Sequence, residues 1–277
     1  MQLGISSLGY IIELGSSGNY KSLIDLQLKA SEACLNFAEE NRIKLVELVL
    51  DPPEMFKKEN YKSFINLISS YSLEKQIHAP FIDVNLCSHN DRISNASVKL
   101  YIETVKICNA ADIKIMTIHP GLANVLISKI RSFNIMRLKQ TIHNLLDFSK
   151  NTEISVCLEN MHQKTHIMTE NSNIEEIFKI IDRQDLFLCY DTSHFYTCDG
   201  DVKKLWSVFY EVIRNVHIVD NFSKTTDTHP PLGTGKINFK EIFEIIKSYN
   251  YKGALIIELS TVKDLPQSID YIKKLIK

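Results

Sequence analysis

Histidine and carboxylate side chains recur at the points where apolar runs of the sequence end. The run QIH ends at His78, IMTIH ends at His119 and CLE ends at Glu159. Further residues of these types end later runs or follow them closely: Asp191, His194, His217, Asp220, Asp227, His229 and Glu258. Imidazole and carboxylate groups are common ligands of Zn²⁺ and Mn²⁺, so a fold that joins these run ends would form a metal centre.

Five of the nine histidines belong to this group. A single histidine at a strand end often only hydrogen-bonds a neighbour, but a chance gathering of so many is not expected. His143 falls on an expected helix and His89 falls in a polar loop, so we expect both to be solvated. His162 and His166 follow Glu159 closely, and the sequence leaves open whether they face the same site.

The stretch TTDTHPPLGTG, residues 225–235, allows three interpretations: a polar loop, a phosphate cradle built on glycine, or half of a metal site. A phosphate loop of the form GxxxxGK[ST] needs Gly where Pro230 stands and Ser or Thr where Ile237 stands. GxSxG and HExxH motifs do not occur in the sequence. We therefore predict that this loop carries part of the metal site, with Gly233 and Gly235 turning the chain into the next helix.

Short apolar runs alternate with longer amphipathic stretches along the whole chain. This pattern predicts alternating strands and helices, which would bring the run ends together. The runs are continuously apolar, as is typical of parallel strands buried on both faces. Eight strand–helix pairs in 277 residues favour an α/β fold, a single (β/α)8 TIM barrel, over an open doubly wound sheet. The expected strands are 2–6, 44–50, 76–80, 113–121, 153–160, 186–191, 215–221 and 254–260. The expected helices are 20–41, 61–73, 97–111, 135–151, 173–182, 202–213, 239–250 and 266–277.

The organisation of the chain and its composition restrict the class of protein. No linker or low-complexity tract is present, so we expect residues 1–277 to form one domain. The net charge of −1 gives no general attraction to nucleic acid. No apolar run approaches the ~18 residues of a membrane span, and no signal peptide is evident. The six cysteines lack CxxC spacing, which predicts buried reduced thiols in a cytoplasmic protein.

Seven segments, in chain order, resemble the xylose-isomerase-like TIM barrel superfamily. This superfamily includes endonuclease IV, of AP endonuclease family 2, and many sugar-phosphate isomerases and epimerases. The segments are HAPFIDVNL (78–86), IHPG (118–121), CLEN (157–160), YDTSH (190–194), VHIVDN (216–221), DTHPPLGTGKINF (227–239) and IIEL (256–259). The resemblance implies a barrel with a divalent metal, Zn²⁺ or Mn²⁺, at one end.

The branches of this superfamily differ in how many metal ions they hold. Similarity to the isomerases and epimerases implies one ion held by Glu159, Asp191, His217 and Glu258, with the two glutamates moving a substrate proton. Similarity to endonuclease IV implies three zinc ions held by nine ligands. The nine matching positions here are His78, His119, Glu159, Asp191, His194, His217, Asp227, His229 and Glu258. The resemblance therefore implies one to three ions per chain.

Two enzyme functions remain as hypotheses. The first is a metal-dependent isomerase or epimerase of a small sugar or sugar phosphate, with Glu159 and Glu258 as catalytic residues. The alternative is an endonuclease IV-like phosphodiesterase that cleaves duplex DNA at abasic sites. Segment 161–171 has no glycine and segment 51–60 has no arginine, which disfavours a grip on bent DNA.

A third hypothesis is a relative of different activity, such as a lyase or dehydratase, or a non-catalytic one, that keeps the metal pocket. Weak candidates for substrate binding are His162, Lys224 and Lys236. We expect no membrane partner, and the sequence does not predict the oligomeric state.

Overall fold

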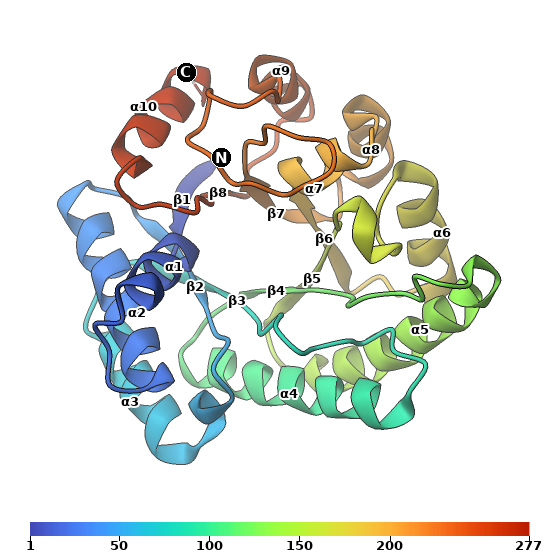
Figure 1. Ribbon diagram of the computed structural model, residues 1–277, viewed down its shortest axis with the longest axis horizontal. Helices are drawn as coiled ribbons and strands as arrows, with labels where there is room; N and C mark the ends of the chain where they lie inside the picture. Colours follow the sequence, from blue (N-terminus) through green and yellow to red (C-terminus); the bar gives the residue numbers. More distant parts are fainter. Residues whose placement is uncertain (277) are drawn as a thin grey trace.

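The computed structural model describes residues 1–276. Its eight strands are parallel and close into a barrel in chain order, with the last strand pairing with the first (Figure 1). The strands are β1 (Gln2–Ser6), β2 (Leu45–Val49), β3 (Glu74–His78), β4 (Ile115–Ile118), β5 (Ser155–Glu159), β6 (Leu186–Asp191), β7 (Ile213–Ile218) and β8 (Ala254–Ile257). The predicted α/β fold, a (β/α)8 TIM barrel, is confirmed.

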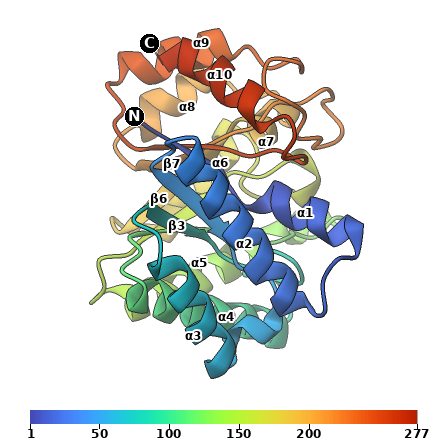
Figure 2. The same cartoon turned by 90° about the vertical axis from the view of Figure 1, so that its left-hand side faces the viewer.

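Helices surround the barrel, as the views along and across it show (Figures 1 and 2). The helices are α1 (Leu8–Ser17), α2 (Leu23–Glu40), α3 (Lys58–Ser69), α4 (Asp91–Ala110), α5 (Arg131–Ser149), α6 (Asn171–Ile181), α7 (Thr192–Thr197), α8 (Val202–Phe209), α9 (Phe239–Ser248) and α10 (Leu265–Ile276). Short 3-10 turns occur at η1 (Pro53–Phe56), η2 (Ser128–Ile130) and η3 (Gln163–Thr165).

Two helices, α1 and α7, were not among the predicted elements. Helix α1 contains Gly9 and Gly15, whose low helix propensity hides it in the sequence. Helix α7 follows β6 directly, and the Asp191 side chain caps it by accepting the backbone N–H of His194 at 2.6 Å. This short helix fixes His194 just beyond the end of the strand.

Several predicted helices have the wrong bounds; α4, for example, begins at Asp91 and not at the predicted residue 97. The predicted helix 202–213 is too long: α8 ends at Phe209, and Ile213 begins β7, where it pairs with Leu188. No Gly or Pro separates these elements, so only the pairing with β6 decides where the strand begins. Helix α3 likewise ends at Ser69, before the predicted end at Leu73.

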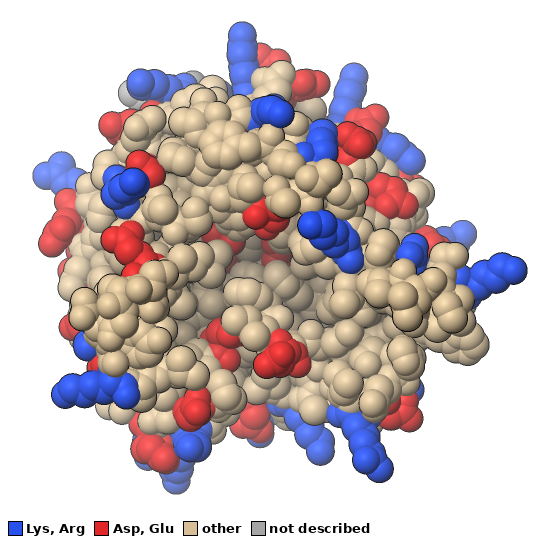
Figure 3. Space-filling model, viewed as in Figure 1, with Lys and Arg blue, Asp and Glu red and all other residues tan. Residues whose placement is uncertain are grey.

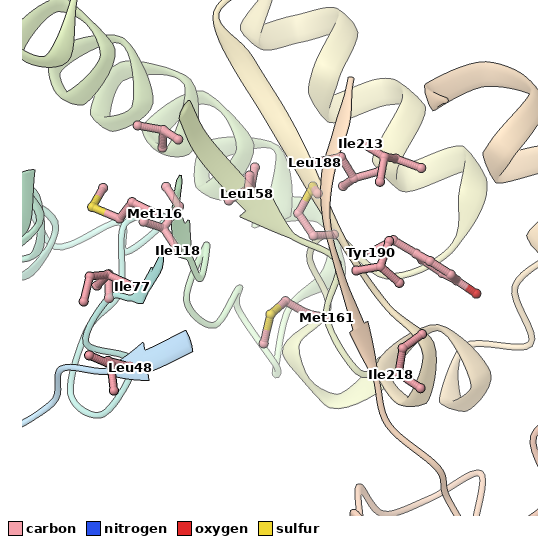
Figure 4. Packing of buried hydrophobic residues seen from close by; sticks show 14 of the residues in the cluster. Leu48, Ile77, Met116, Ile118, Leu158, Met161, Leu188, Tyr190, Ile213 and Ile218 are labelled. Atoms are coloured by element: carbon pink, nitrogen blue, oxygen red, sulfur yellow. The ribbon is translucent and has the colours of Figure 1, made fainter. Parts of the chain in front are cut away.

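Side chains alternate between two environments along each strand. Ile77, Leu158 and Leu188 belong to the apolar layer between the strands and the helices (Figure 4). Their strand neighbours His78 and Glu159 project to the opposite face, the inside of the barrel, where they contact each other. A separate apolar cluster at the amino-terminal end of the interior consists of Leu45, Ala254 and Ile256. The interior is therefore apolar at its base and polar at its mouth.

The cysteines and the helices test what the sequence predicts about thiols and membrane spans. All six cysteines are free thiols; five are buried, as predicted, whereas Cys198 is half-buried. Among the helices of residues 1–276, none combines the length and the apolar character that crossing a bilayer requires.

Candidate metal centre

The nine predicted ligands meet at the carboxyl end of the barrel, although they come from six strands and the loops that follow them. Figure 3 shows a hollow in this face, with acidic side chains inside it. His78, Glu159 and Asp191 are the last residues of β3, β5 and β6. Because these strands are parallel, their carboxyl ends lie on one rim, which explains the convergence.

Glu159 is the centre of the cluster. Its Oε2 atom lies 3.3 Å from His78 Nε2 and 3.0 Å from His119 Nε2. Its Oε1 atom lies 3.3 Å from His194 Nδ1 and 3.2 Å from His217 Nδ1. Burial alone would raise the pKa of Glu159, but the imidazoles around it bring this pKa well below its usual value. The Glu159 carboxylate therefore contacts four of the predicted ligands, two through each oxygen.

His217, on β7, presents Nδ1 to three carboxylates. Besides Glu159, this atom lies 3.9 Å from Asp191 Oδ2 and 3.7 Å from Glu258 Oε2. These four residues are the set that the isomerase and epimerase branch implies for a single metal ion. Burial raises the pKa of Asp191 to about 7, so this carboxyl group loses its proton near neutral pH.

Asp227 and His229 form a third group with His194. Asp227 Oδ2 lies 3.2 Å from His194 Nε2 and 2.8 Å from His229 Nε2. His229 Nδ1 lies 3.4 Å from Glu258 Oε1, which joins this group to the rest of the cluster. Burial disfavours the charged form of His229, but the hydrogen bond to Asp227 and the charge of Asp227 outweigh it and raise the pKa of His229 to about 9.

The donors fit a divalent cation. Within residues 1–276, the buried atoms Asp191 Oδ2 and His229 Nδ1 make no hydrogen bond, and a bound cation would satisfy such atoms. Four sets of side chains have ligand atoms within 4.8 Å of one another. These sets are His78–His119–Glu159, Glu159–Asp191–His194, Glu159–Cys189–His217 and Glu47–His217–Glu258.

Two of the histidines among the predicted ligands are oriented by backbone carbonyl groups. Nδ1 of His78 lies 2.8 Å from the Ala79 carbonyl, and Nδ1 of His194 lies 2.9 Å from the Asn160 carbonyl. A ring nitrogen that donates its proton to a carbonyl leaves the other nitrogen, Nε2, with a free lone pair for a metal. Both rings are therefore prepared to act as ligands through Nε2.

The loop of residues 225–235 is clamped by Asp220, which follows β7. The Asp220 carboxylate accepts the backbone N–H groups of Gly233 at 2.9 Å and Gly235 at 2.8 Å. A side chain at residue 235 would collide with this carboxylate, and residue 233 has a φ of +82°, so both positions require glycine. Asp220 holds the loop in place and is not among the residues that contact Glu159.

The backbone of this loop also directs His229 toward the cluster. His229 has a φ of 45°, a conformation that residues other than glycine rarely adopt. Its carbonyl accepts two hydrogen bonds of 3.1 Å, from the N–H and the hydroxyl of Ser260.

The Asp227 carboxylate is held by a pair of buried polar side chains. It accepts a hydrogen bond from the hydroxyl of Ser193, and this hydroxyl in turn accepts one from the Asn221 amide at 2.8 Å. Neither Ser193 nor Asn221 was singled out in the sequence.

The weaker substrate-binding candidates differ in their surroundings. The His162 ring lies 5.6 Å from the His194 ring between centroids, so His162 borders the cluster. The Lys224 ammonium pairs with Asp199 at 2.6 Å and lies 3.7 Å from the centre of the Tyr196 ring. Lys236 is exposed.

The remaining histidines lie away from the nine ligands. His166 is half-buried in a surface depression that Arg131 and Glu170 also line. His89 is exposed, as predicted. His143 was expected to be solvated, but it is half-buried and its Nε2 lies 2.7 Å from the Ile181 carbonyl, at the end of α6.

One buried carboxylate in contact with the cluster was missed. Glu47, on β2, is completely buried, and its Oε1 atom lies 3.0 Å from His217 Nε2. Burial alone would raise the pKa of Glu47, but His217 brings it below its usual value. The sequence signal was the single charged residue within the apolar run LVELVL, residues 45–50.

Two proteins of similar sequence differ in the length they share with this chain. An uncharacterized protein of Methanocaldococcus jannaschii is 27% identical over 99% of this chain and 89% of its own length. A probable endonuclease 4 of Mycoplasma genitalium is 24% identical over 65% of this chain and 65% of its own length.

Solved structures and a family model agree on the fold. A D-tagatose 3-epimerase-like protein has a TM-score of 0.82 at 25% identity, with 100% of this chain and 97% of that chain covered. The IolI protein, solved with a zinc atom bound, has a TM-score of 0.77 at 16% identity, with 99% and 96% covered. The model of the xylose isomerase-like TIM barrel family matches residues 35–275, so the chain belongs to this family.

Proposed function

We propose that this protein is a metal-dependent isomerase or epimerase of a small sugar or sugar phosphate. The observation that carries the proposal is the placement of Glu159 and Glu258, at 3.2 and 3.7 Å from the same atom, His217 Nδ1. We propose that Glu159, Asp191, His217 and Glu258 hold a divalent cation, Zn²⁺ or Mn²⁺. Such a cation would bind adjacent sugar oxygens and acidify the C–H bond beside them.

The two glutamates then have unequal parts in proton transfer. A carboxylate beside the substrate carbon can remove its proton and return one. Glu258 is 7% exposed and Glu159 is 1% exposed, and Glu159 is also enclosed by four imidazoles. We therefore assign Glu258 the larger part in moving the proton and Glu159 the larger part in holding metal. His162, beside His194, is the candidate for a substrate contact.

The charge around the site favours a small substrate over DNA. Most Lys and Arg side chains project from the periphery of the barrel face, while acidic side chains lie in its central hollow (Figure 3). Binding of duplex DNA draws on many contacts between cationic side chains and phosphates. The similarity to a D-tagatose 3-epimerase-like protein along the entire chain supports the same choice.

Solvent hydrogen exchange tests this function directly. The metal-loaded protein is incubated in D2O with a panel of ketoses, aldoses and their phosphates, and the sugars are followed by proton NMR. We expect one C–H signal of the substrate to disappear as deuterium enters, and a second sugar to accumulate. Chelator-treated protein is the control. Absence of exchange across the panel, with metal bound, would exclude the proposed reaction.

A second candidate is an endonuclease IV-like phosphodiesterase acting at abasic sites. The observation that favours it is the contact of all nine matching residues within one cluster, including the outer pair Asp227 and His229. Similarity to a probable endonuclease 4 adds support. Several cations held together would neutralise the charge that develops on a phosphodiester during hydrolysis.

Abasic duplex DNA and elemental analysis separate the two candidates. Cleavage of a labelled abasic duplex in the presence of Zn²⁺ or Mn²⁺, with an intact undamaged duplex as control, would establish the phosphodiesterase. Three bound ions per chain favour this second candidate and one ion favours the isomerase. An abasic duplex that stays intact after long incubation with the fully metal-loaded protein rules the phosphodiesterase out.

A further inference from the structure

A layer of polar side chains crosses the barrel interior beneath the metal centre. It consists of Glu47 on β2, Gln76 on β3, Thr117 on β4 and Asn215 on β7, all of them buried. Branched apolar residues usually fill this part of a TIM barrel. A carboxylate in such a place is costly unless partners compensate its charge. The layer therefore needs an explanation beyond packing.

One carboxylate oxygen of Glu47 is satisfied by hydrogen bonds within this layer. Its Oε2 atom accepts the side-chain amides of Gln76 and Asn215, each at 2.8 Å. Asn215 Nδ2 gives its other proton to Thr117 Oγ1 at 3.0 Å, and its Oδ1 accepts Gln76 Nε2 at 2.9 Å. Asn215 Nδ2 also lies 3.1 Å from His217 Nε2. Because this amide gives its two protons to the closer atoms of Glu47 and Thr117, it has none left for His217.

The other oxygen of Glu47 is directed to the metal centre. Oε1 receives no hydrogen bond from the polar layer and lies 3.0 Å from His217 Nε2. This oxygen can accept a hydrogen bond from His217 only if Nε2 carries a proton. In a neutral ring with its proton on Nε2, the lone pair is on Nδ1. Nδ1 is the atom that faces Glu159, Asp191 and Glu258.

We infer that Glu47 is a positioning residue of the metal centre, whose carboxylate holds the proton of His217 on Nε2 and so keeps Nδ1 free to bind a cation. Gln76 and Asn215 fix the carboxylate, and the rigid layer fixes the plane of the ring. Outer partners of this kind raise the metal affinity of a histidine about 10- to 100-fold. This role rests on the proposed function only in requiring that the cluster binds a metal. It does not depend on which reaction the protein catalyses.

The variant Glu47→Gln tests this role without a substrate. The amide can donate to His217 Nε2, which favours a proton on Nδ1, where it blocks the metal. We expect the zinc affinity, measured by competition with a chromogenic chelator, to fall about 10- to 100-fold. The control Gln27→Met removes a buried side-chain amide of α2 that lies outside this layer, and its zinc affinity should stay close to that of wild type. Thermal unfolding of the two metal-free variants should be similar.

Nitrogen-15 NMR of the zinc-loaded wild-type protein tests the same contact if Glu47→Gln fails to fold. We expect His217 to carry a proton on Nε2 and to coordinate through Nδ1. Coordination through Nε2, or equal zinc affinity in wild type and Glu47→Gln, would overturn the inference while leaving the proposed function intact. Wild-type protein that binds no metal would overturn both. A lack of sugar conversion with normal zinc binding would affect only the proposed function.

Discussion

Glu159 Oε1 lies 3.2 Å from His217 Nδ1, although the two residues belong to strands β5 and β7, which are separated in the barrel by β6. Both side chains point into the barrel, so the contact spans its interior. It joins the group around His78 and His119 to the group around Asp191 and Glu258. The cluster is therefore one connected centre and not a set of separate pairs.

Glu159→Gln should lower the amount of metal that the protein binds. Because each oxygen of Glu159 faces two imidazoles, an amide in its place weakens every group that shares it. We expect the loss of affinity to exceed the about 10- to 100-fold cost of losing an outer partner. Elemental analysis after dialysis against a chelator measures the bound ions per chain. Glu244→Gln, at an exposed position on α9, is the control, and unchanged stoichiometry in Glu159→Gln would contradict the central role of Glu159 in the cluster.

Glu258→Gln should separate metal binding from proton transfer. Glu258 contacts His217 and His229 at 3.7 and 3.4 Å, longer than the contacts of Glu159, so we expect most of the metal to stay bound. Deuterium exchange into the substrate should fall by a factor of about 10² to 10⁴, the usual contribution of a general base. The rate is measured by NMR at equal metal occupancy. Exchange at the wild-type rate would show that another group moves the proton.

The metal-free protein should lose stability as the pH rises from 7 to 9. The folded pKa of His229, about 9, lies above its ordinary value of 6.5, so its stabilisation is present below pH 6.5 and is lost as the pH rises through 9. Burial lowers the pKa of His119 to about 4, so His119 does not titrate in this window. Thermal melts at several pH values measure the effect, and His229→Gln should reduce it. A melting temperature that rises across this window would contradict the assignment.

Metal uptake should strengthen over a similar range of pH. A cation displaces the proton of His229, and below about pH 7 it also displaces the proton of Asp191, whose folded pKa is about 7. We expect the increase in melting temperature caused by zinc to be larger at pH 8 than at pH 6. The same increase at both pH values would show that these groups are not ligands.

Asp220→Asn should loosen the loop of residues 225–235. The carboxylate of Asp220 accepts hydrogen bonds from the backbone N–H groups of Gly233 and Gly235. An Asn amide is uncharged and has only one accepting atom, so it replaces these bonds only in part. Hydrogen bonds to a charged group contribute about 1.5–3 kcal/mol each, so we expect the free energy of unfolding to fall by about 2–4 kcal/mol. Urea unfolding measures this change. Asp112→Asn, at a side chain that is 87% exposed, is the control, and an equal effect in both would contradict the clamp.

The sequence was sufficient to predict which residues reach the mouth of the barrel. Parallel strands buried on both faces appear as continuous apolar runs, and the residue that ends each run lies at the rim once the barrel closes. His78, Glu159 and Asp191 were found in this way and end β3, β5 and β6. The choice among the interpretations of residues 225–235 depended on the same inventory.

The sequence did not predict the residues that support the cluster. Asp220 and Glu47 are carboxylates like the others, but Asp220 clamps a loop through backbone N–H groups and Glu47 lies one layer below the rim. Helix α7, which carries His194, is too short to show a helical period. Local pattern cannot distinguish these roles, because they depend on partners that are distant in the chain.

The sequence by itself determined the order of the elements, the alternation of side chains between the two faces of each strand, and hence the residue types at the mouth. Only the tertiary structure decided which atoms meet: Glu159 with four imidazoles, and His217 with Glu47 on one nitrogen and three carboxylates on the other. The physical reason is that alternation fixes the face of a side chain, whereas contacts across the interior depend on how the strands are staggered when the barrel closes.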